Sequence, residues 1–226
     1  MKTIPKFTLL TLAVATLAAC STSATGRRQF IMVGDAEMAQ MGHMAYAEEK
    51  KASKASTDAK AVRYVQCVTD AVLKNVSVPK EIAEKWTVTL FEAKDVNAYA
   101  LPGGNIGVYT GLLGVAKTQD QLAAVIGHEI AHVTERHGAE RVSQSQLASM
   151  GMDIAAVAMG QPSPAKDMLY AAMGLGTQVG LLKFSRTHES EADYLGLDLM
   201  AKAGFDPREA VTLWQNMAKA SEGAPP

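Results

Sequence analysis

Two histidines separated by three residues, with a glutamate directly after the first, place the strongest constraint on how this chain can fold. They form the segment His128-Glu129-Ile130-Ala131-His132, inside an apolar run from Leu122 to Val133. Thr118 and Gln121 have the spacing of a capping box, which indicates that a helix begins there and continues to about Glu135. Residues four apart on a helix lie about 40° apart around its axis. We therefore predict that both imidazoles lie on one helical face.

Two neutral imidazoles on one face are suited to a single Zn²⁺ ion. The alternative is two histidines on an ordinary helix, but titratable groups in an apolar run are costly without partners. Glu129 lies about 100° from His128 around the axis, so it can reach water at a metal without being a ligand. Zinc acidifies such water, and a carboxylate can take its proton. We predict His128 and His132 as zinc ligands and Glu129 as the catalytic base.

A catalytic zinc needs a third protein ligand and an open position. The next acidic cluster is His188-Glu189-Ser190-Glu191-Ala192-Asp193, in a predicted helix. Glu189 and Asp193 share a helical face, whereas Glu191 points roughly 160–200° away. We predict that Glu189 is the third ligand, that Asp193 accepts a hydrogen bond from the far nitrogen of a ligand histidine, and that Glu191 is a solvated surface charge. His188 is the alternative third ligand, and an ordinary charged helix start is the alternative for the cluster.

The N-terminus has the pattern of a secretory signal peptide, with a short basic start and an apolar stretch of residues 7–19. Leu17-Ala18-Ala19-Cys20 resembles the bacterial lipobox, which implies cleavage before Cys20 and lipidation of that cysteine. A plain signal peptide with a chance cysteine is the alternative. By the sorting rule that this resemblance implies, Ser21 rather than aspartate favours the outer membrane. We expect a signal peptide at residues 1–19, a lipidated tether at 20–34, and one domain at 35–226 whose C-terminus is truncated or naturally short.

Composition is typical of a globular protein, with 48% hydrophobic and 20% charged residues and a net charge of −1. This charge balance argues against nucleic acid as a partner.

Cys67 lies in an apolar helical pattern, so we expect a small buried side chain. The apolar stretch from Met168 to Leu182 contains three glycines and a glutamine, so we expect a buried or groove-covering helix rather than a membrane span.

Periodicity and turn signals predict an α+β fold that is mostly helical, with a small β-sheet beside the histidine helix. Strands are expected at residues 86–91 and 106–110, and a turn at 102–104. Gly103, Gly104, Asn105 and Ile106 are predicted to line a substrate groove, because a strand beside the zinc helix can pair with an extended peptide. A plain hairpin is the alternative. Further helices are expected at residues 35–54, 59–75, 139–159, 187–203 and 207–220.

The HExxH segment, Ser185-Arg186, Glu189 and Asp193 together resemble the zinc metallopeptidase family of the CAAX prenyl proteases and HtpX. Residues 97–104, running into 106–111, are similar to the stretch before the active helix in its soluble periplasmic lipoprotein branch, the LoiP-like and BepA-like proteins. The resemblance covers about residues 26–220. It implies a gluzincin fold, Glu189 as third ligand, and an acidic partner near the site for Arg186. Family members usually continue with a Thr-His-Pro segment near the metal, whereas this chain ends at Pro226.

The resemblance also implies a role in quality control of outer-membrane proteins. We expect an endopeptidase with one zinc ion per chain, on the periplasmic face of the outer membrane of a Gram-negative bacterium. Its partners would be polypeptide substrates, the membrane through lipidated Cys20, and the outer-membrane assembly machinery. The alternative is a zinc-binding lipoprotein chaperone or scaffold that cleaves little. Glu129 favours the enzyme, because a scaffold would not need this base.

Overall fold

The computed structural model describes residues 20–147 and 184–221. The predicted signal peptide, residues 148–159 of the predicted helix and the apolar stretch 168–182 lie outside these residues. Strands are β1 (Cys20–Thr22), β2 (Arg28–Phe30), β3 (Thr87–Phe91), β4 (Ala98–Leu101) and β5 (Asn105–Tyr109). Helices are α2 (Asp35–Ala52), α3 (Ala59–Leu73), the 3₁₀ helix η1 (Thr110–Gly114), α4 (Gln119–Thr134), α7 (Arg186–Lys202) and α8 (Glu209–Ser221). Residues 137–147 are also helical.

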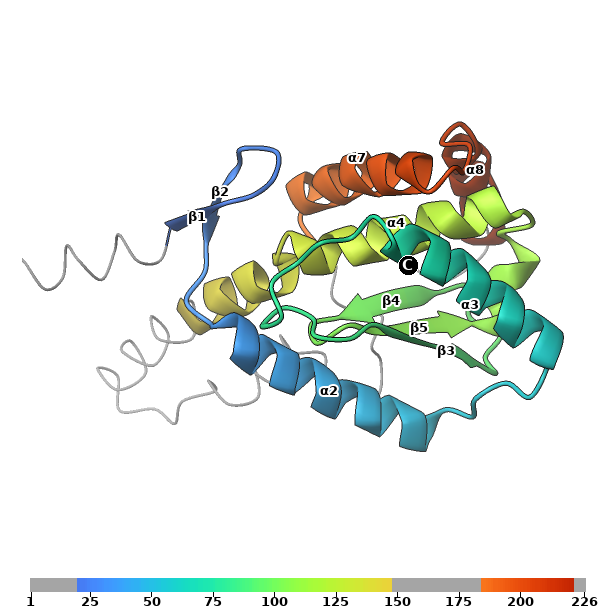
Figure 1. Cartoon of the computed structure of the whole chain (residues 1–226), viewed down its shortest axis with the longest axis horizontal. Coiled ribbons are helices and arrows are strands. Elements are labelled where there is room, and N and C mark those ends of the chain that lie inside the picture. The colour runs from blue at the N-terminus through green and yellow to red at the C-terminus, as the bar shows by residue number, and fades with distance from the viewer. Residues whose placement is uncertain (1–19, 148–183, 222–226) are drawn as a thin grey trace, which may run out of the picture.

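A small sheet lies between helices and has the strand order β3-β5-β4 (Figure 1). β3 runs parallel to β5, and β4 runs antiparallel to it. The main core packs Val65 of α3 and Ile126 of α4 against Ile106 of β5. On the other face, Tyr46 of α2 packs against Phe91 and Tyr99. The predicted α+β architecture, mostly helical with a small sheet beside the histidine helix, is confirmed.

Helix α4 runs through the main core. Thr118 caps it by accepting a hydrogen bond from the backbone N–H of Gln121 at 3.2 Å, as the capping pattern predicts. Helix α7 crosses it closely at Gly127 and Gly196, where a Cβ on Gly196 would lie 2.6 Å from the backbone nitrogen of His128. The two glycines therefore bring the acidic cluster of α7 next to the histidines of α4. Within the described residues, no helix is long and apolar enough to cross a membrane.

Strand β4 was not among the predicted strands. Two of its four residues are alanines, which have little strand propensity. It forms because it pairs with β5, where Gly107 leaves room for the Tyr99 ring; a Cβ on Gly107 would lie 2.2 Å from Tyr99 Cζ. The predicted turn before β5 is present, and Gly103 and Gly104 adopt φ of 89° and 83°, which favour glycine.

The prediction that Cys67 is buried is wrong, because its side chain is exposed. The buried stripe of α3 includes Val65, Val68 and Val72. Cys67 precedes Val68 by one residue, which turns it about 100° around the helix. Cys67 therefore lies beside the buried stripe and not within it.

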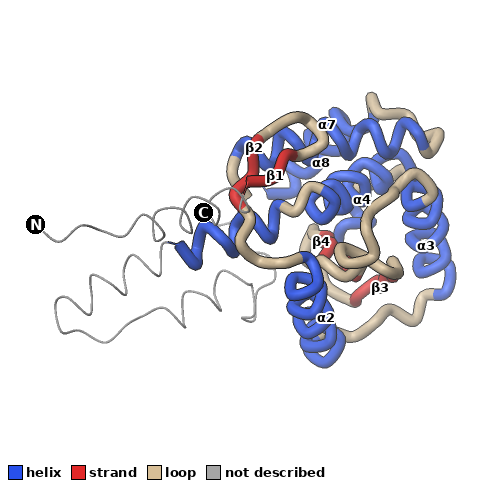
Figure 2. The backbone as a smooth tube through the Cα atoms, turned by 60° about the vertical axis from the view of Figure 1, so that its left-hand side comes forward, coloured by secondary structure: helices blue, strands red, loops and turns tan. Residues whose placement is uncertain are grey.

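Residues 20–34, predicted to be a tether, contain an antiparallel hairpin of β1 and β2 that packs on the domain (Figure 2). The backbone N–H of Ala24 donates to the Glu135 carboxylate at 2.8 Å, and the N–H of Met32 donates to Ser143 Oγ at 2.8 Å. Gln29 also donates to the backbone carbonyl of Glu135. The polar composition that indicated a tether instead supplies hydrogen bonds to the end of α4 and to the helix after it.

Candidate metal centre

Three side chains from α4 and α7 converge at the predicted metal site. The Nε2 atoms of His128 and His132 lie 3.0 Å apart. Glu189 places carboxylate oxygens 3.5 Å from His128 Nε2 and 3.7 Å from His132 Nε2. Ligand atoms about 2.0–2.1 Å from a tetrahedral zinc would be separated by about 3.3 Å. The three residues form a group able to hold one metal ion, so the donor set fits zinc.

The far nitrogens of both histidines already have hydrogen-bond partners. His128 Nδ1 lies 2.9 Å from Asp193 Oδ1, in the relation predicted for Asp193. His132 Nδ1 lies 2.9 Å from His137 Nδ1. The Nδ1 atoms therefore face partners in the protein, and the Nε2 atoms face Glu189 and one another. This is the orientation in which two histidines bind a metal through Nε2.

The electrostatics of the group favour a cation. Burial tends to lower the pKa of His128, but hydrogen bonds to Asp193 and Glu189 outweigh it and raise that pKa to about 10. Burial lowers the pKa of His132 to about 2, and the neighbouring positive charge of His128 acts in the same direction. The carboxylates that stabilise a proton on His128 would also stabilise a divalent ion bound at Nε2.

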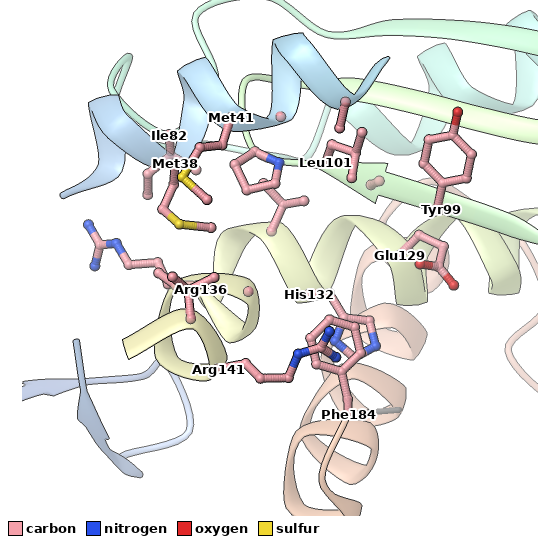
Figure 3. Close-up of a pocket in the computed structure, with 18 of the residues that line it drawn as sticks. Met38, Met41, Ile82, Tyr99, Leu101, Glu129, His132, Arg136, Arg141 and Phe184 are labelled. Carbon is pink, nitrogen blue, oxygen red and sulfur yellow. The ribbon is translucent and has the colours of Figure 1, made fainter. Parts of the chain in front are cut away.

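Glu129 lies beside the histidines without joining the ligand group. Burial raises the pKa of its carboxyl to about 7, while the positive charge of His128 and a hydrogen bond from the backbone N–H of Ala100 oppose the rise. The carboxyl faces the pocket near His132 and Tyr99 (Figure 3). A carboxylate in the pocket wall next to a metal-binding group is placed as a general base would be.

A pocket of about 270 Å³ extends from the histidines between α4, β4 and α2 (Figure 3). Residues 97–102 form one wall of the pocket, and Met38 and Met41 of α2 line the pocket farther from the histidines. Met38 is also buried in a small hydrophobic cluster with Val33 and Val142.

The prediction that Gly103, Gly104, Asn105 and Ile106 line a substrate groove is wrong. All four are buried, and none of them lines the pocket. Asn105 and Ile106 belong to β5, which is paired on both sides and has no free edge. The strand that borders the pocket is β4, which lies at the edge of the sheet.

Glu191 points away from the metal group, but the prediction that it is a solvated charge is wrong. It is 5% exposed and bonds to Arg27, Ser23, Thr25 and His137. The hairpin that covers it was expected to be a tether, which is why the burial was not foreseen.

The remaining candidates lie outside the metal group. His188, the alternative third ligand, is buried with its Nε2 3.0 Å from Glu140 Oε2. Arg186 is exposed in the first turn of α7. His137 is absent from the ligand group but contacts His132 directly. The spacing of five residues between His132 and His137 does not predict this contact, because the helix is interrupted at residues 135–136.

Comparison with known proteins agrees with this geometry. The model of Peptidase family M48 matches residues 59–222. The chain belongs to peptidase family M48. The members of this family are generally zinc-dependent metallopeptidases, in agreement with the His-His-Glu group. The match includes α4 and α7 and therefore every residue of that group.

Similar proteins include mitochondrial and bacterial proteases. The chain is 39% identical to the mitochondrial metalloendopeptidase OMA1 of Schizosaccharomyces pombe, over 67% of the chain and 43% of the relative. It is 32% identical to mitochondrial metalloendopeptidase OMA1 of Bos taurus, over 85% of the chain and 38% of the relative. It is 28% identical to the beta-barrel assembly-enhancing protease of Escherichia coli K12, over 67% of the chain and 32% of the relative. The chain thus spans less than half the length of these relatives.

Proposed function

We propose that this protein is a zinc-dependent endopeptidase of the bacterial cell envelope that cleaves unfolded or misassembled periplasmic and outer-membrane proteins. The observation that carries the proposal is the convergence of His128, His132 and Glu189 on one point, with Glu129 beside it in the wall of a pocket. Family membership and the metalloendopeptidase names of the relatives support the same activity.

In this proposal, His128, His132 and Glu189 hold one zinc ion, which would acidify a water molecule and polarise the peptide carbonyl. Glu129 would accept a proton from the attacking water at its carboxylate and deliver it to the nitrogen of the departing amine. The position of its carboxyl beside the ligand group, in the wall of the pocket, suits both steps. Asp193 holds His128 with its Nε2 toward the metal.

The free edge of β4 would bind an extended segment of the substrate. Tyr109 N–H donates to the Asn97 carbonyl at 3.1 Å, and hydrogen-bonded pairs alternate along an antiparallel ladder. Ala98 and Ala100 therefore point their backbone N–H and C=O groups away from β5, on the edge that borders the pocket. The Ala100 N–H already donates to Glu129, so a peptide would bond to the Ala98 N–H and to the two carbonyls. A peptide added at this edge would need an unfolded backbone, which agrees with unfolded proteins as substrates.

We further propose that Cys20 is lipidated and anchors the protein to the periplasmic face of the outer membrane. The lipobox-like sequence before Cys20 and Ser21 after it support this location. The outer-membrane assembly machinery is a candidate partner, because one relative is named a beta-barrel assembly-enhancing protease. The competing function is a zinc-binding chaperone or scaffold, but Glu129 and its raised pKa favour hydrolysis.

Replacing Glu129 with glutamine tests the activity. Glutamine has nearly the same shape but cannot accept the proton, so Glu129→Gln should retain zinc and digest casein at least about 100-fold more slowly. Wild-type protein treated with a chelator is the control for metal dependence. Near-normal digestion by Glu129→Gln would remove Glu129 from the mechanism. A wild type that binds zinc but leaves casein intact would favour the chaperone or scaffold.

A further inference from the structure

A line of buried polar groups joins His132 to the N-terminal hairpin. His132 Nδ1 lies 2.9 Å from His137 Nδ1, and His137 Nε2 lies 2.9 Å from Glu191 Oε2. Arg27, in the hairpin loop, donates from Nε to the same carboxylate oxygen at 2.8 Å. His137 is 0% exposed and Glu191 5%. Four residues from three parts of the sequence are therefore connected by direct side-chain contacts.

The hairpin encloses the carboxylate end of this line. The hydroxyls of Ser23 and Thr25 both donate to Glu191 Oε1. Arg27 also reaches Glu140 with Nη1, at 2.8 and 3.0 Å from its two oxygens. Figure 2 shows the hairpin beside α7, the helix that carries Glu191. Glu191 is thus surrounded by donors, most of which belong to the hairpin.

The donors and acceptors along this line determine which nitrogen of each histidine carries the hydrogen. Arg27 forms an ion pair with Glu191 Oε2 at 2.8 Å, and the hydroxyls of Ser23 and Thr25 donate to Oε1, so these contacts hold Glu191 as an ionised carboxylate. The ionised carboxylate can only accept, so His137 carries its hydrogen on Nε2. A neutral His137 then accepts at Nδ1, and the donor facing it is Nδ1–H of His132.

This arrangement decides which nitrogen of His132 is available to a metal. With its hydrogen on Nδ1, His132 presents the lone pair of Nε2 toward His128 and Glu189. The opposite tautomer would place a hydrogen in the metal group and prevent binding. His128 obtains the same orientation from Asp193 directly, whereas His132 reaches its carboxylate through an intervening imidazole.

We propose that His137 and Glu191 are positioning residues that set the metal-binding tautomer of His132, and that Arg27 extends this support to the N-terminal hairpin. The proposal rests on His132 being a zinc ligand, as in the proposed function. The hairpin precedes residues 59–222, which the family model matches. Support for the metal group therefore comes from a segment outside the matched region.

The test measures the zinc dissociation constant by competition with a chromophoric chelator, using the whole chain and zinc alone as the probe. His137→Leu removes the acceptor and should weaken zinc binding about 10–100-fold. His137→Gln offers a carbonyl oxygen to His132 and should recover most of the affinity. Arg27→Met should weaken binding in the same direction by a smaller factor, and unchanged affinity would remove the hairpin from the proposal.

Ser143→Ala is the matched control. Ser143 is 0% exposed and lies on the same helix as His137. It accepts a hydrogen bond from Met32, after the hairpin, and donates one to the Ala139 carbonyl, so its hydrogen bonds are outside the line. Its loss should leave zinc affinity unchanged. Equal affinities of wild type, His137→Leu and Ser143→Ala would overturn the proposal, and a wild type without zinc affinity would instead overturn the proposed function.

A measurement on the unmodified protein tests the same proposal without any variant, so it does not depend on whether the variants fold. Nitrogen-15 spectra of the histidine rings in the zinc-loaded wild type should show His132 with its hydrogen on Nδ1 and His137 with its hydrogen on Nε2. A His137 ring protonated on both nitrogens, or a His132 ring bound to zinc through Nδ1, would overturn the proposal.

Discussion

At the scale of residues, spacing along one helix predicted much more than contacts between segments. His128 and His132 are four apart on α4, and their convergence follows from helical geometry alone. The pairing of Glu189 with Asp193 on α7 was predictable for the same reason. The contact of His137 with Glu191 was not, because it joins side chains 54 residues apart. No periodic pattern connects residues at such a separation.

Asp193 supports His128 without belonging to the ligand group, and replacing it separates these two roles. Asp193→Asn should weaken zinc affinity about 10–100-fold, because the amide is a poorer acceptor for the hydrogen on Nδ1. Activity should recover at high zinc concentration. Glu189→Gln, the comparison variant, should stay inactive at every zinc concentration, because it lacks a ligand. A zinc titration of casein digestion decides this, and an Asp193→Asn protein that no zinc concentration restores would indicate a different role.

At the scale of elements, boundaries with a local signal were predictable. Asp58 caps α3 by accepting hydrogen bonds from the N–H groups of Lys60 and Ala61, and Thr118 caps α4. Strand β4 carries no such signal, since its alanines become a strand only through pairing with β5. Because β4 was not predicted, β5 was expected to have a free edge, and the groove was therefore assigned to the residues at the start of β5.

The close crossing of α4 and α7 is an element-level feature that stability measurements can test. A Cβ on Gly196 would lie 2.6 Å from the His128 nitrogen and 2.8 Å from its Cα, so Gly196→Ala must push the helices apart. We expect it to lower the free energy of unfolding by about 1–3 kcal/mol and to weaken zinc binding. Chemical denaturation and zinc titration measure the two effects.

Gly34→Ala is the control, because a Cβ there meets no atom within 4 Å and φ is −70°. Its free energy of unfolding should change by no more than about 0.5 kcal/mol. If Gly196→Ala were as stable as this control, the close crossing would not be what holds the two halves of the metal group together.

At the scale of the whole molecule, the fold class was predictable because the sequence contains long periodic helices and few strands. The packing of the N-terminal hairpin was not, because residues 20–34 are rich in serine, threonine and glycine, a composition typical of linkers. Their order comes from partners elsewhere in the chain, including Glu135, Glu140 and Glu191. The hairpin also begins at Cys20, so a lipid there would place the domain close to the membrane surface.

The membrane anchor is testable at this scale. Cys20→Ser removes the proposed lipidation site, and several acyl chains are what makes an anchor stable. We expect the wild type to sediment with outer membranes and the variant to appear in the soluble fraction after osmotic shock. Cys67→Ser, which changes the exposed cysteine of α3, is the control and should sediment like wild type. Sedimentation of Cys20→Ser with the membrane would show that another segment provides the anchor.

The zinc content of purified protein tests the central claim most directly. After equilibration with a small excess of zinc and removal of free metal, the wild type should contain about one zinc ion per chain. His132→Ala removes one of the three side chains in the metal group and should leave the protein folded, as judged by circular dichroism, but nearly free of zinc. Equal zinc content in the wild type and His132→Ala would contradict the account.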